Sequence, residues 1–316
     1  MKKVLRANTY FLIIILLQLF LPIHLMFKWF NITDTKLMLL ISHIITFIFP
    51  AIIYLVITRQ SAKDVLKLNK LYFKDTLLII LLAFVCQPIM IFFSLLSQFF
   101  FENEIGNFVT GIVNSPYIIL LLLIAVLPAV TEEITIRGIV LSGYEDKNIY
   151  LSCIITGLLF GIMHLDPQQF LYAAVLGFVL ALVVRITNSI FASALIHFFI
   201  NGTSITLQKL LSLIPENTPV MEQATEVSLR SLDIQEKIFM SSFYGLIALA
   251  FGIAAYFIIK KLADLNIRRG IIDKDELSIK YNKSNERVFD ISFIVIIIIY
   301  LLYMMSGIIV KYFLYR

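Results

Sequence analysis

Residues 116–144 read PYIILLLLIAVLPAVTEEITIRGIVLSGY, an apolar run whose second half holds Glu132, Glu133 and Arg137. About 20 apolar residues in a helix cross the hydrocarbon core of a bilayer. Lipid offers no hydrogen-bond partners, so a spanning segment has to satisfy its own backbone polar groups. We therefore expect a transmembrane helix here. It is too long for one straight span, and it carries charge where charge is costly.

The composition extends this expectation to the whole chain. Of its 316 residues, 60% are hydrophobic and 15% are charged, and the mean hydropathy is +0.92. Soluble domains have about 45–50% apolar and about 25% charged residues. The two cysteines, Cys86 and Cys153, both lie in apolar runs, which argues against a disulfide framework and a thiolate zinc site. The composition indicates an integral membrane protein.

The apolar runs predict an all-α fold, a polytopic transmembrane helical bundle of about nine spans (eight or nine) without a soluble domain. The predicted spans are 10–30, 36–57, 76–100, 116–144, 150–165, 168–187, 190–211, 238–259 and 289–311. We divide the chain into N-terminal transmembrane helices (1–115), core helices (116–211), and C-terminal loops with two more transmembrane helices (212–316). The lipid bilayer is the expected surrounding, and no motif indicates a nucleic-acid partner.

Basic residues predict the orientation. Lys2, Lys3 and Arg6 precede an apolar run without a small-residue cleavage site, which indicates an uncleaved anchor rather than a signal peptide. With nine spans, 18 of the 26 Lys and Arg residues fall on the side of the N-terminus and 7 on the other. Because Lys and Arg are enriched in cytoplasmic segments, we expect a cytoplasmic N-terminus and an external C-terminus.

The charged residues of the fourth span form a candidate functional site. Glu133 and Arg137 are four residues apart, so they share a helix face and are able to pair. Glu132 is rotated by about 100° and points elsewhere. Pro128 lies four residues before Glu132 and predicts a kink, because it lacks a backbone donor. A charge within a membrane span costs about 2.5–3.5 kcal/mol, which favours function. A structural ion pair is the alternative.

The next helix adds Phe160 and His164, which are one turn apart, so we expect the ring to pack against the imidazole. Gly157 and Gly161 form a small-residue face that allows another helix to approach closely. A histidine in a helix is also a common packing residue. This element therefore indicates function only in combination with the others.

A third element consists of His197 and Asn201, which again project from one helix face. Interhelical hydrogen bonding is the alternative to a functional role. His24 and His43 belong to no such pair, and we interpret both as packing residues.

The depths of these residues are in partial conflict. At ~1.5 Å per residue, Glu132 and His164 lie ~22–26 Å from the predicted turn near 145–149. His197 lies only ~13 Å from the turn near 188–189. We expect a tilted, broken or re-entrant span to close this gap of ~10 Å.

The order Glu-Glu-x-x-x-Arg, Phe-x-x-x-His and His-x-x-x-Asn on successive apolar helices resembles the type II CAAX prenyl endopeptidases and bacteriocin-processing enzymes, also called CPBP or Abi proteins. The resemblance covers about residues 116–205, and the flanking spans match only as membrane helices. It implies an intramembrane endopeptidase of a bacterial cell membrane, acting on a membrane-associated peptide or protein.

Carried over residue by residue, the resemblance implies that Glu132 activates water, that His164 and His197 complete the site, and that Asn201 supports the oxyanion. The supporting residues would be Glu133, Arg137 and Phe160. Peptide hydrolysis needs an activated water and an oxyanion donor, so the residue types agree with this implication. Gly-x-Ser-x-Gly and His-Glu-x-x-His motifs are absent, and no Asp lies mid-span.

The sequence leaves the cofactor open. Glu132, His164 and His197 are candidate ligands of a divalent metal such as zinc, and metal-independent glutamate chemistry is the other reading. Oligomeric state and substrate identity have no sequence signal. The alternative functions are a non-catalytic membrane immunity or scaffold protein and, less favoured, a proton-coupled transporter.

Overall fold

A computed structural model describes residues 2–214, 229–279 and 282–314, and these residues form helices and no strand. Part of the predicted polar stretch 212–237, residues 215–228, lies outside the described residues.

The helices follow the apolar runs of the sequence. They are α1 (Lys3–Phe20), α2 (Ile23–Trp29), α3 (Thr35–His43), α4 (Phe49–Thr58), α5 (Ala62–Val65), α6 (Phe73–Gln98), α7 (Glu104–Ile112), α8 (Tyr117–Leu120), α9 (Leu127–Glu133), α10 (Leu141–Gly143), α11 (Ile149–Met163), α12 (Pro167–Thr187), α13 (Ile190–Leu211), α15 (Ile234–Arg268) and α16 (Ile291–Leu314). Short π-helical segments, Ile44–Ile48, Leu121–Val126 and Ile134–Val140, join α3 to α4, α8 to α9 and α9 to α10. A single 3₁₀ turn, Lys274–Leu277, follows α15.

Seven of these helices are long and apolar enough to cross a membrane: Lys3–Phe20, Thr35–Thr58, Phe73–Gln98, Tyr117–Gly143, Pro167–Thr187, Ile190–Leu211 and Ile234–Arg268. Two shorter apolar helices are Ile149–Met163 and Ile291–Gly307. The fold is therefore an all-helical membrane bundle, as predicted. The count of about nine spans is not confirmed.

Two predicted boundaries are wrong. The first span begins at Lys3 rather than residue 10 and ends at Phe20, because the chain breaks at Leu21 and Pro22 before α2. The predicted loop 260–288 begins later, because α15 continues to Arg268. The end of α15 is held by Asp75, the Oδ2 atom of which accepts a hydrogen bond from Arg269 Nη1 at 2.6 Å.

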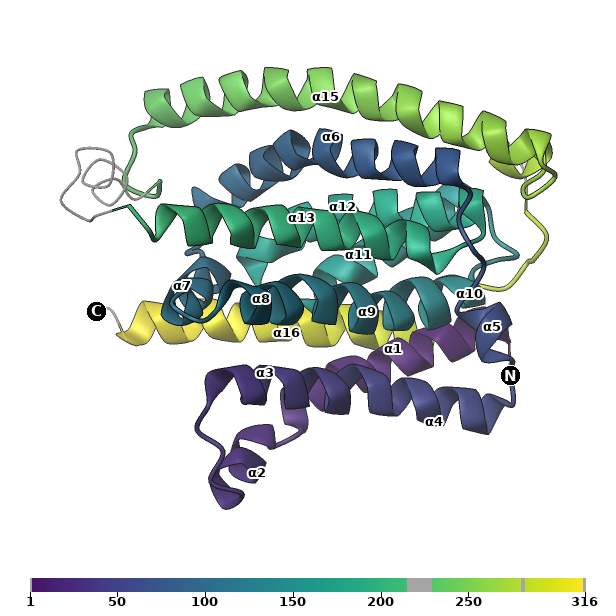
Figure 1. Cartoon of the computed structure of the whole chain (residues 1–316). Helices are drawn as coiled ribbons and strands as arrows, with labels where there is room; N and C mark the ends of the chain where they lie inside the picture. The colour runs from purple at the N-terminus through teal and green to yellow at the C-terminus, as the bar shows by residue number, and fades with distance from the viewer. Residues whose placement is uncertain (1, 215–228, 280–281, 315–316) are drawn as a thin grey trace.

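The helices run side by side in a single bundle (Figure 1). α15 lies along α6 at one edge, and α3 and α4 lie at the opposite edge, with α8 to α13 between them. α1 packs against α16 and α10. The start of α1 and the end of α16 lie at opposite ends of the bundle (Figure 1).

The closest helix pair is α11 and α12, and glycines make it close. A Cβ added at Gly157 would lie 2.7 Å from Ala174 O, and one at Gly161 would lie 2.7 Å from Phe170 O. Contacts this short cannot form with a side chain present, so the backbone of α12 rests on these glycines. The predicted small-residue face is thus confirmed. It brings the C-terminal end of α11, with His164, against the start of α12.

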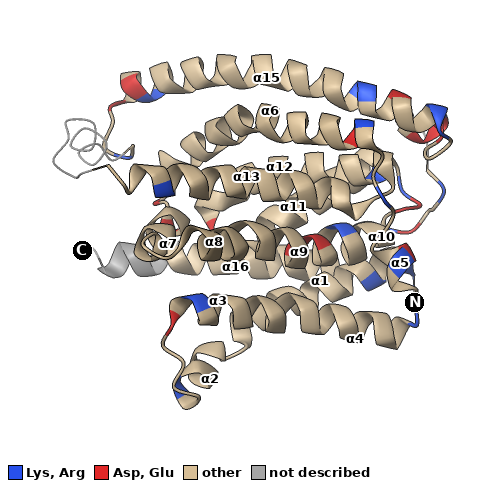
Figure 2. Ribbon diagram, viewed as in Figure 1, with Lys and Arg blue, Asp and Glu red and all other residues tan. Residues whose placement is uncertain are grey.

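Charged residues gather toward the two ends of the helices, while α9 carries acids within the bundle (Figure 2). At the end that holds the N-terminus, Lys67 joins two turns by bonding to Glu145 and, at 3.0 Å, to Asn188 Oδ1. The turn before α11 and the turn before α13 therefore lie at one level. Depths counted along the helices from these two turns can therefore be compared directly.

Candidate active site

The fourth span, Tyr117–Gly143, changes its hydrogen-bonding register on both sides of the acidic pair. π-helical segments precede and follow α9, and Pro128 stands in its first turn. Leu127 N–H bonds to Leu122 O, five residues back, at the end of the first π segment. Such π bulges often occur at functional sites. The kink predicted from Pro128 stays a prediction. The structure has π-helical turns on both sides of α9, and Glu132 and Glu133 end the short α-helix between them.

Glu133 lies in a closed ionic cluster. Its Oε1 atom pairs with Arg137 Nη1 at 3.0 Å and with His197 Nδ1 at 2.8 Å. The side chains of Glu133 and Arg137 are 1% and 0% exposed. A buried charge is tolerated when it is paired and hydrogen-bonded. The predicted pairing of Glu133 with Arg137 is confirmed, and the cluster also joins α9 to α13.

Phe160 connects this cluster to both histidines. The Arg137 guanidinium carbon lies 4.1 Å from the centre of the Phe160 ring, a cation–π distance. The same ring meets His164 edge-on at 4.9 Å and His197 at 5.8 Å, between ring centres. The predicted packing of Phe160 on His164 is confirmed. The two imidazoles, from α11 and α13, are thereby brought to one aromatic ring.

Glu132 faces the opposite way, into a cavity of about 630 Å³. Its Oε2 atom is buried, and no described residue hydrogen-bonds to it. His197 Nε2 lies 3.9 Å from this oxygen, which is too far for a direct hydrogen bond. A buried polar atom without a partner is uncommon and calls for a water, an ion or a substrate. Glu133 Oε2 is also buried without a partner, but of the two carboxylates Glu132 is the one that lines the cavity.

His164 and Asn201 line the same cavity as Glu132 and His197. His164 Nδ1 lies 2.8 Å from Phe160 O. A carbonyl oxygen only accepts, so Nδ1 carries the proton and Nε2 is left as an acceptor. Asn201 Nδ2 donates to Ile124 O at 3.1 Å, and its second N–H has no partner among the described residues. All four residues predicted as catalytic therefore share one cavity.

The depths of Glu132 and His197 differ less in the structure than the sequence predicts. The fourth span ends at Gly143 and α13 begins at Ile190. Measured from these ends, Glu132 lies ~16 Å deep and His197 ~10 Å deep, a difference of ~6 Å that side chains bridge. The prediction counted from the centre of a turn whose residues are not helical, and it therefore placed Glu132 too deep.

His43, which the sequence indicated only as a packing residue, also lines the cavity. Its Nδ1 atom lies 2.8 Å from Thr131 Oγ1, and Thr131 directly precedes Glu132. His43 thus packs on Phe47 and also makes a polar contact across the bundle, which the packing interpretation did not include. No local pattern signals this contact, because the partners are 88 positions apart. His24, in contrast, is exposed on α2 and lies outside the cavity lining.

The placement of the possible metal ligands bears on the metal hypothesis. Among the described residues, no group of three or more His, Cys, Asp or Glu side chains is placed to hold a metal ion. His197 and His164 each have their Nδ1 atom engaged by a protein acceptor, as metal-bound histidines do. Metal binding by Glu132, His164 and His197 stays a prediction. We therefore derive no catalytic step through a metal.

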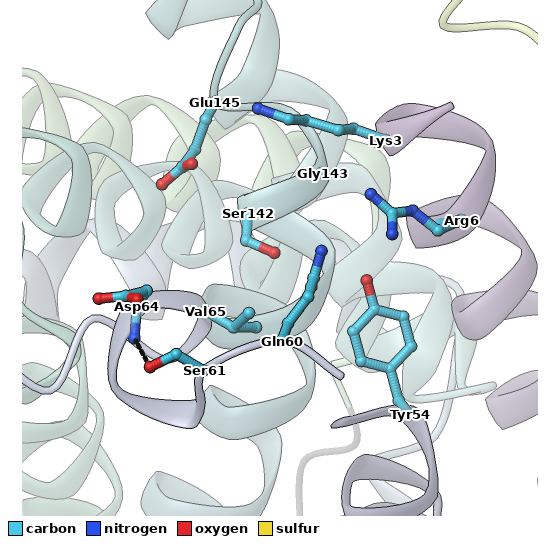
Figure 3. Close-up of a pocket in the computed structure, with 10 residues that line it drawn as sticks. All are labelled: Lys3, Arg6, Tyr54, Gln60, Ser61, Asp64, Val65, Ser142, Gly143 and Glu145. Carbon is cyan, nitrogen blue, oxygen red and sulfur yellow. Dashed lines mark hydrogen bonds between the residues drawn. The ribbon is translucent and has the colours of Figure 1, made fainter. Parts of the chain in front are cut away.

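A second cavity, of about 240 Å³, lies at the end of the bundle that holds the N-terminus (Figure 3). Its lining includes Arg6, Asp64 and Glu145 but no histidine. Glu145 is paired with Lys67, and Lys3, also on its wall, is paired with Asp146 at 2.8 Å. Asp64, the other carboxylate on its wall, is exposed, so this cavity lacks a buried carboxylate oxygen without a partner, which the first cavity has in Glu132.

Residues 114–203 match the family described as type II CAAX prenyl endopeptidase Rce1-like. This segment contains α9, α11 and the histidine end of α13, which hold the three motifs. This segment is therefore similar to the Rce1-like endopeptidases, as its motifs indicated. No curated protein and no solved structure matches the chain.

Proposed function

We propose that this protein is an intramembrane endopeptidase in which Glu132 activates the water that attacks the peptide bond. One observation carries the proposal: the buried, unpartnered Oε2 atom of Glu132 faces an imidazole across 3.9 Å inside a bundle of apolar helices. The Rce1-like match supports protease activity at the level of the family.

The ionic cluster of Glu133, Arg137 and His197 would orient the imidazole of His197. The carboxylate of Glu133 only accepts, so His197 donates through Nδ1 and turns Nε2 toward Glu132. A water held between Nε2 and Oε2 would lie within hydrogen-bond reach of both atoms. Glu132 takes a proton as this water attacks the carbonyl carbon and returns it to the leaving amine. His164 completes the wall from α11.

The attack places negative charge on the carbonyl oxygen, which needs a fixed donor. Asn201 is positioned for this role, because its bond to Ile124 O holds the amide still while its second N–H is unused. In a cavity of low dielectric constant, one such donor stabilises the oxyanion more strongly than it would in water.

The test is peptide processing by the purified full-length protein in liposomes. The probe is a library of membrane-associated peptides, and cleavage is read by mass spectrometry. We expect cleavage by the wild-type protein and by His24→Gln, whose site is exposed and remote. Glu132→Gln and His164→Ala should lose it at equal abundance in the membrane. Cleavage by Glu132→Gln would overturn the proposed role, and loss of the protein itself would favour a scaffold.

Metal dependence has a separate test. Glutamate chemistry without a metal predicts that cleavage continues in a chelator such as EDTA and that the purified active protein holds less than stoichiometric metal. Loss of cleavage in chelator, restored by zinc, would instead support a metal bound by Glu132, His164 and His197.

A further inference from the structure

His43 belongs to a part of the chain that the family match does not include, since the match covers residues 114–203. It is the last residue of α3, directly before the π-helical segment Ile44–Ile48. Its ring packs against Phe47 at 5.3 Å, and its Nδ1 atom contacts Thr131 Oγ1 at 2.8 Å. The N-terminal helices therefore place an imidazole beside the proposed catalytic carboxylate.

The hydrogen bonds of Thr131 determine which nitrogen of His43 carries the proton. A hydroxyl has one hydrogen, and Thr131 donates its hydrogen to Leu127 O at 2.9 Å. Thr131 Oγ1 must therefore accept from His43 Nδ1–H. In the neutral imidazole, Nε2 is then a lone-pair acceptor. No described residue occupies this nitrogen, and His43 lines the cavity.

The position of His43 relative to the carboxylate follows from helix geometry. Successive residues of a helix are rotated by about 100°, so Thr131 and Glu133 lie on opposite sides of Glu132. His43 contacts Thr131, and His197 contacts Glu133. The two imidazoles therefore flank Glu132, one from α3 and one from α13. His197 Nδ1 is engaged by the Glu133 carboxylate, whereas His43 has no acid within hydrogen-bond distance among the described residues.

We propose that His43 is a substrate-binding residue: its Nε2 atom accepts a hydrogen bond from a main-chain N–H of the bound peptide, beside the bond that is cleaved. This inference rests on the proposed function, because it requires a peptide in the cavity. A peptide main chain supplies N–H donors at regular intervals, whereas a hydrocarbon or prenyl chain supplies none. The contact therefore selects the peptide part of a substrate.

Two substitutions separate this role from a structural one. In His43→Asn the side-chain amide occupies the place of Nδ1 and keeps the donor to Thr131, but the acceptor is lost. In His43→Gln the amide reaches the place of Nε2 and keeps an acceptor, but the bond to Thr131 is lost. A substrate-binding role predicts that Asn is the worse replacement. A purely structural role predicts that Gln is.

The measurement is the Kd of a fluorescent copy of a peptide that the wild-type protein cleaves, bound to full-length protein in the Glu132→Gln background. One lost hydrogen bond predicts a Kd raised roughly fivefold to tenfold by His43→Asn and less than about twofold by His43→Gln. His24→Gln is the control, with no change expected. In the active protein, His43→Asn should raise KM by a similar factor with little effect on kcat.

Each outcome is decisive. If His43→Asn binds the peptide as the parent does, or if His43→Gln is the weaker binder, the inference is wrong while the role of Glu132 stands. If wild-type protein cleaves no peptide, or if Glu132→Gln still cleaves, the proposed function fails and the inference fails with it.

Discussion

The two sides of α9 differ although adjacent, chemically identical residues define them. On the closed side, Glu133 shares one oxygen between Arg137 and His197 and is 1% exposed. On the cavity side, Glu132 lines a cavity of about 630 Å³ that Glu133 does not line, although each carboxylate has one buried oxygen without a hydrogen-bond partner among the described residues. Residue type does not separate structure from chemistry here. The separation comes from which neighbours each carboxylate meets after a rotation of about 100°.

The comparison predicts that replacing Glu133 with Gln destabilises the protein much more than the same substitution at Glu132. Glu133→Gln removes the anion that pairs with the fully buried Arg137, and breaking a buried ion pair costs about 3–5 kcal/mol. Glu132→Gln should change the unfolding free energy by less than about 1 kcal/mol, because its carboxylate accepts no hydrogen bond from the described residues and contacts His197 only at 3.9 Å. Thermal unfolding in detergent measures both, and equal destabilisation would remove the distinction between the two sides.

A second prediction concerns the donor on the cavity side. Asn201→Ala should lower kcat by about 10²–10³, the effect of losing one oxyanion donor, with a smaller change in KM. Leu207→Ala, on the same helix, exposed and outside the cavity lining, is the matched control and should retain the wild-type rate. Steady-state kinetics on a cleaved peptide measure both variants. A change confined to KM would assign Asn201 to ground-state binding instead.

The smallest predicted effect concerns the glycines that hold α11 and its histidine in place. In Gly161→Ala the added Cβ would lie 2.7 Å from Phe170 O, and such overpacking costs about 1–3 kcal/mol. Gly111→Ala meets no atom within 4 Å, and a helical alanine is favoured over glycine by up to about 1 kcal/mol. Unfolding temperatures should therefore move in opposite directions. If both variants are equally stable, close approach of α12 does not depend on Gly161.

Contacts within one turn of a helix were predictable from the sequence. The spacing of Glu133 and Arg137 gave their pairing, the spacing of Phe160 and His164 gave their ring contact, and two glycines gave a close helix pair. Each depends on the 3.6-residue period of the helix, which holds before any tertiary structure is known. The polar residues of the core were therefore identified correctly as a group, although their catalytic roles stay predictions.

Contacts between distant segments were not predictable. His43 and Thr131 are 88 positions apart, and no residue near either of them in the sequence indicates their contact. The depth of Glu132 was wrong by several ångströms because the sequence does not say how many residues a turn removes from the helix. The end of the first span depended on the break at Pro22, and the end of α15 depended on Asp75, which lies on α6.

The length of α15 has a consequence for the lipid around the protein. Thirty-five helical residues extend for ~52 Å, whereas the hydrocarbon layer is about 30 Å thick. Even a strongly tilted rod of this length overhangs the layer, and the overhang holds Lys260, Lys261 and Arg268. We expect these cations to reach the phosphate groups of the lipids, and Arg269 holds the same end of α15 to Asp75 on α6. We therefore expect anionic phospholipids to gather around this cationic end of α15.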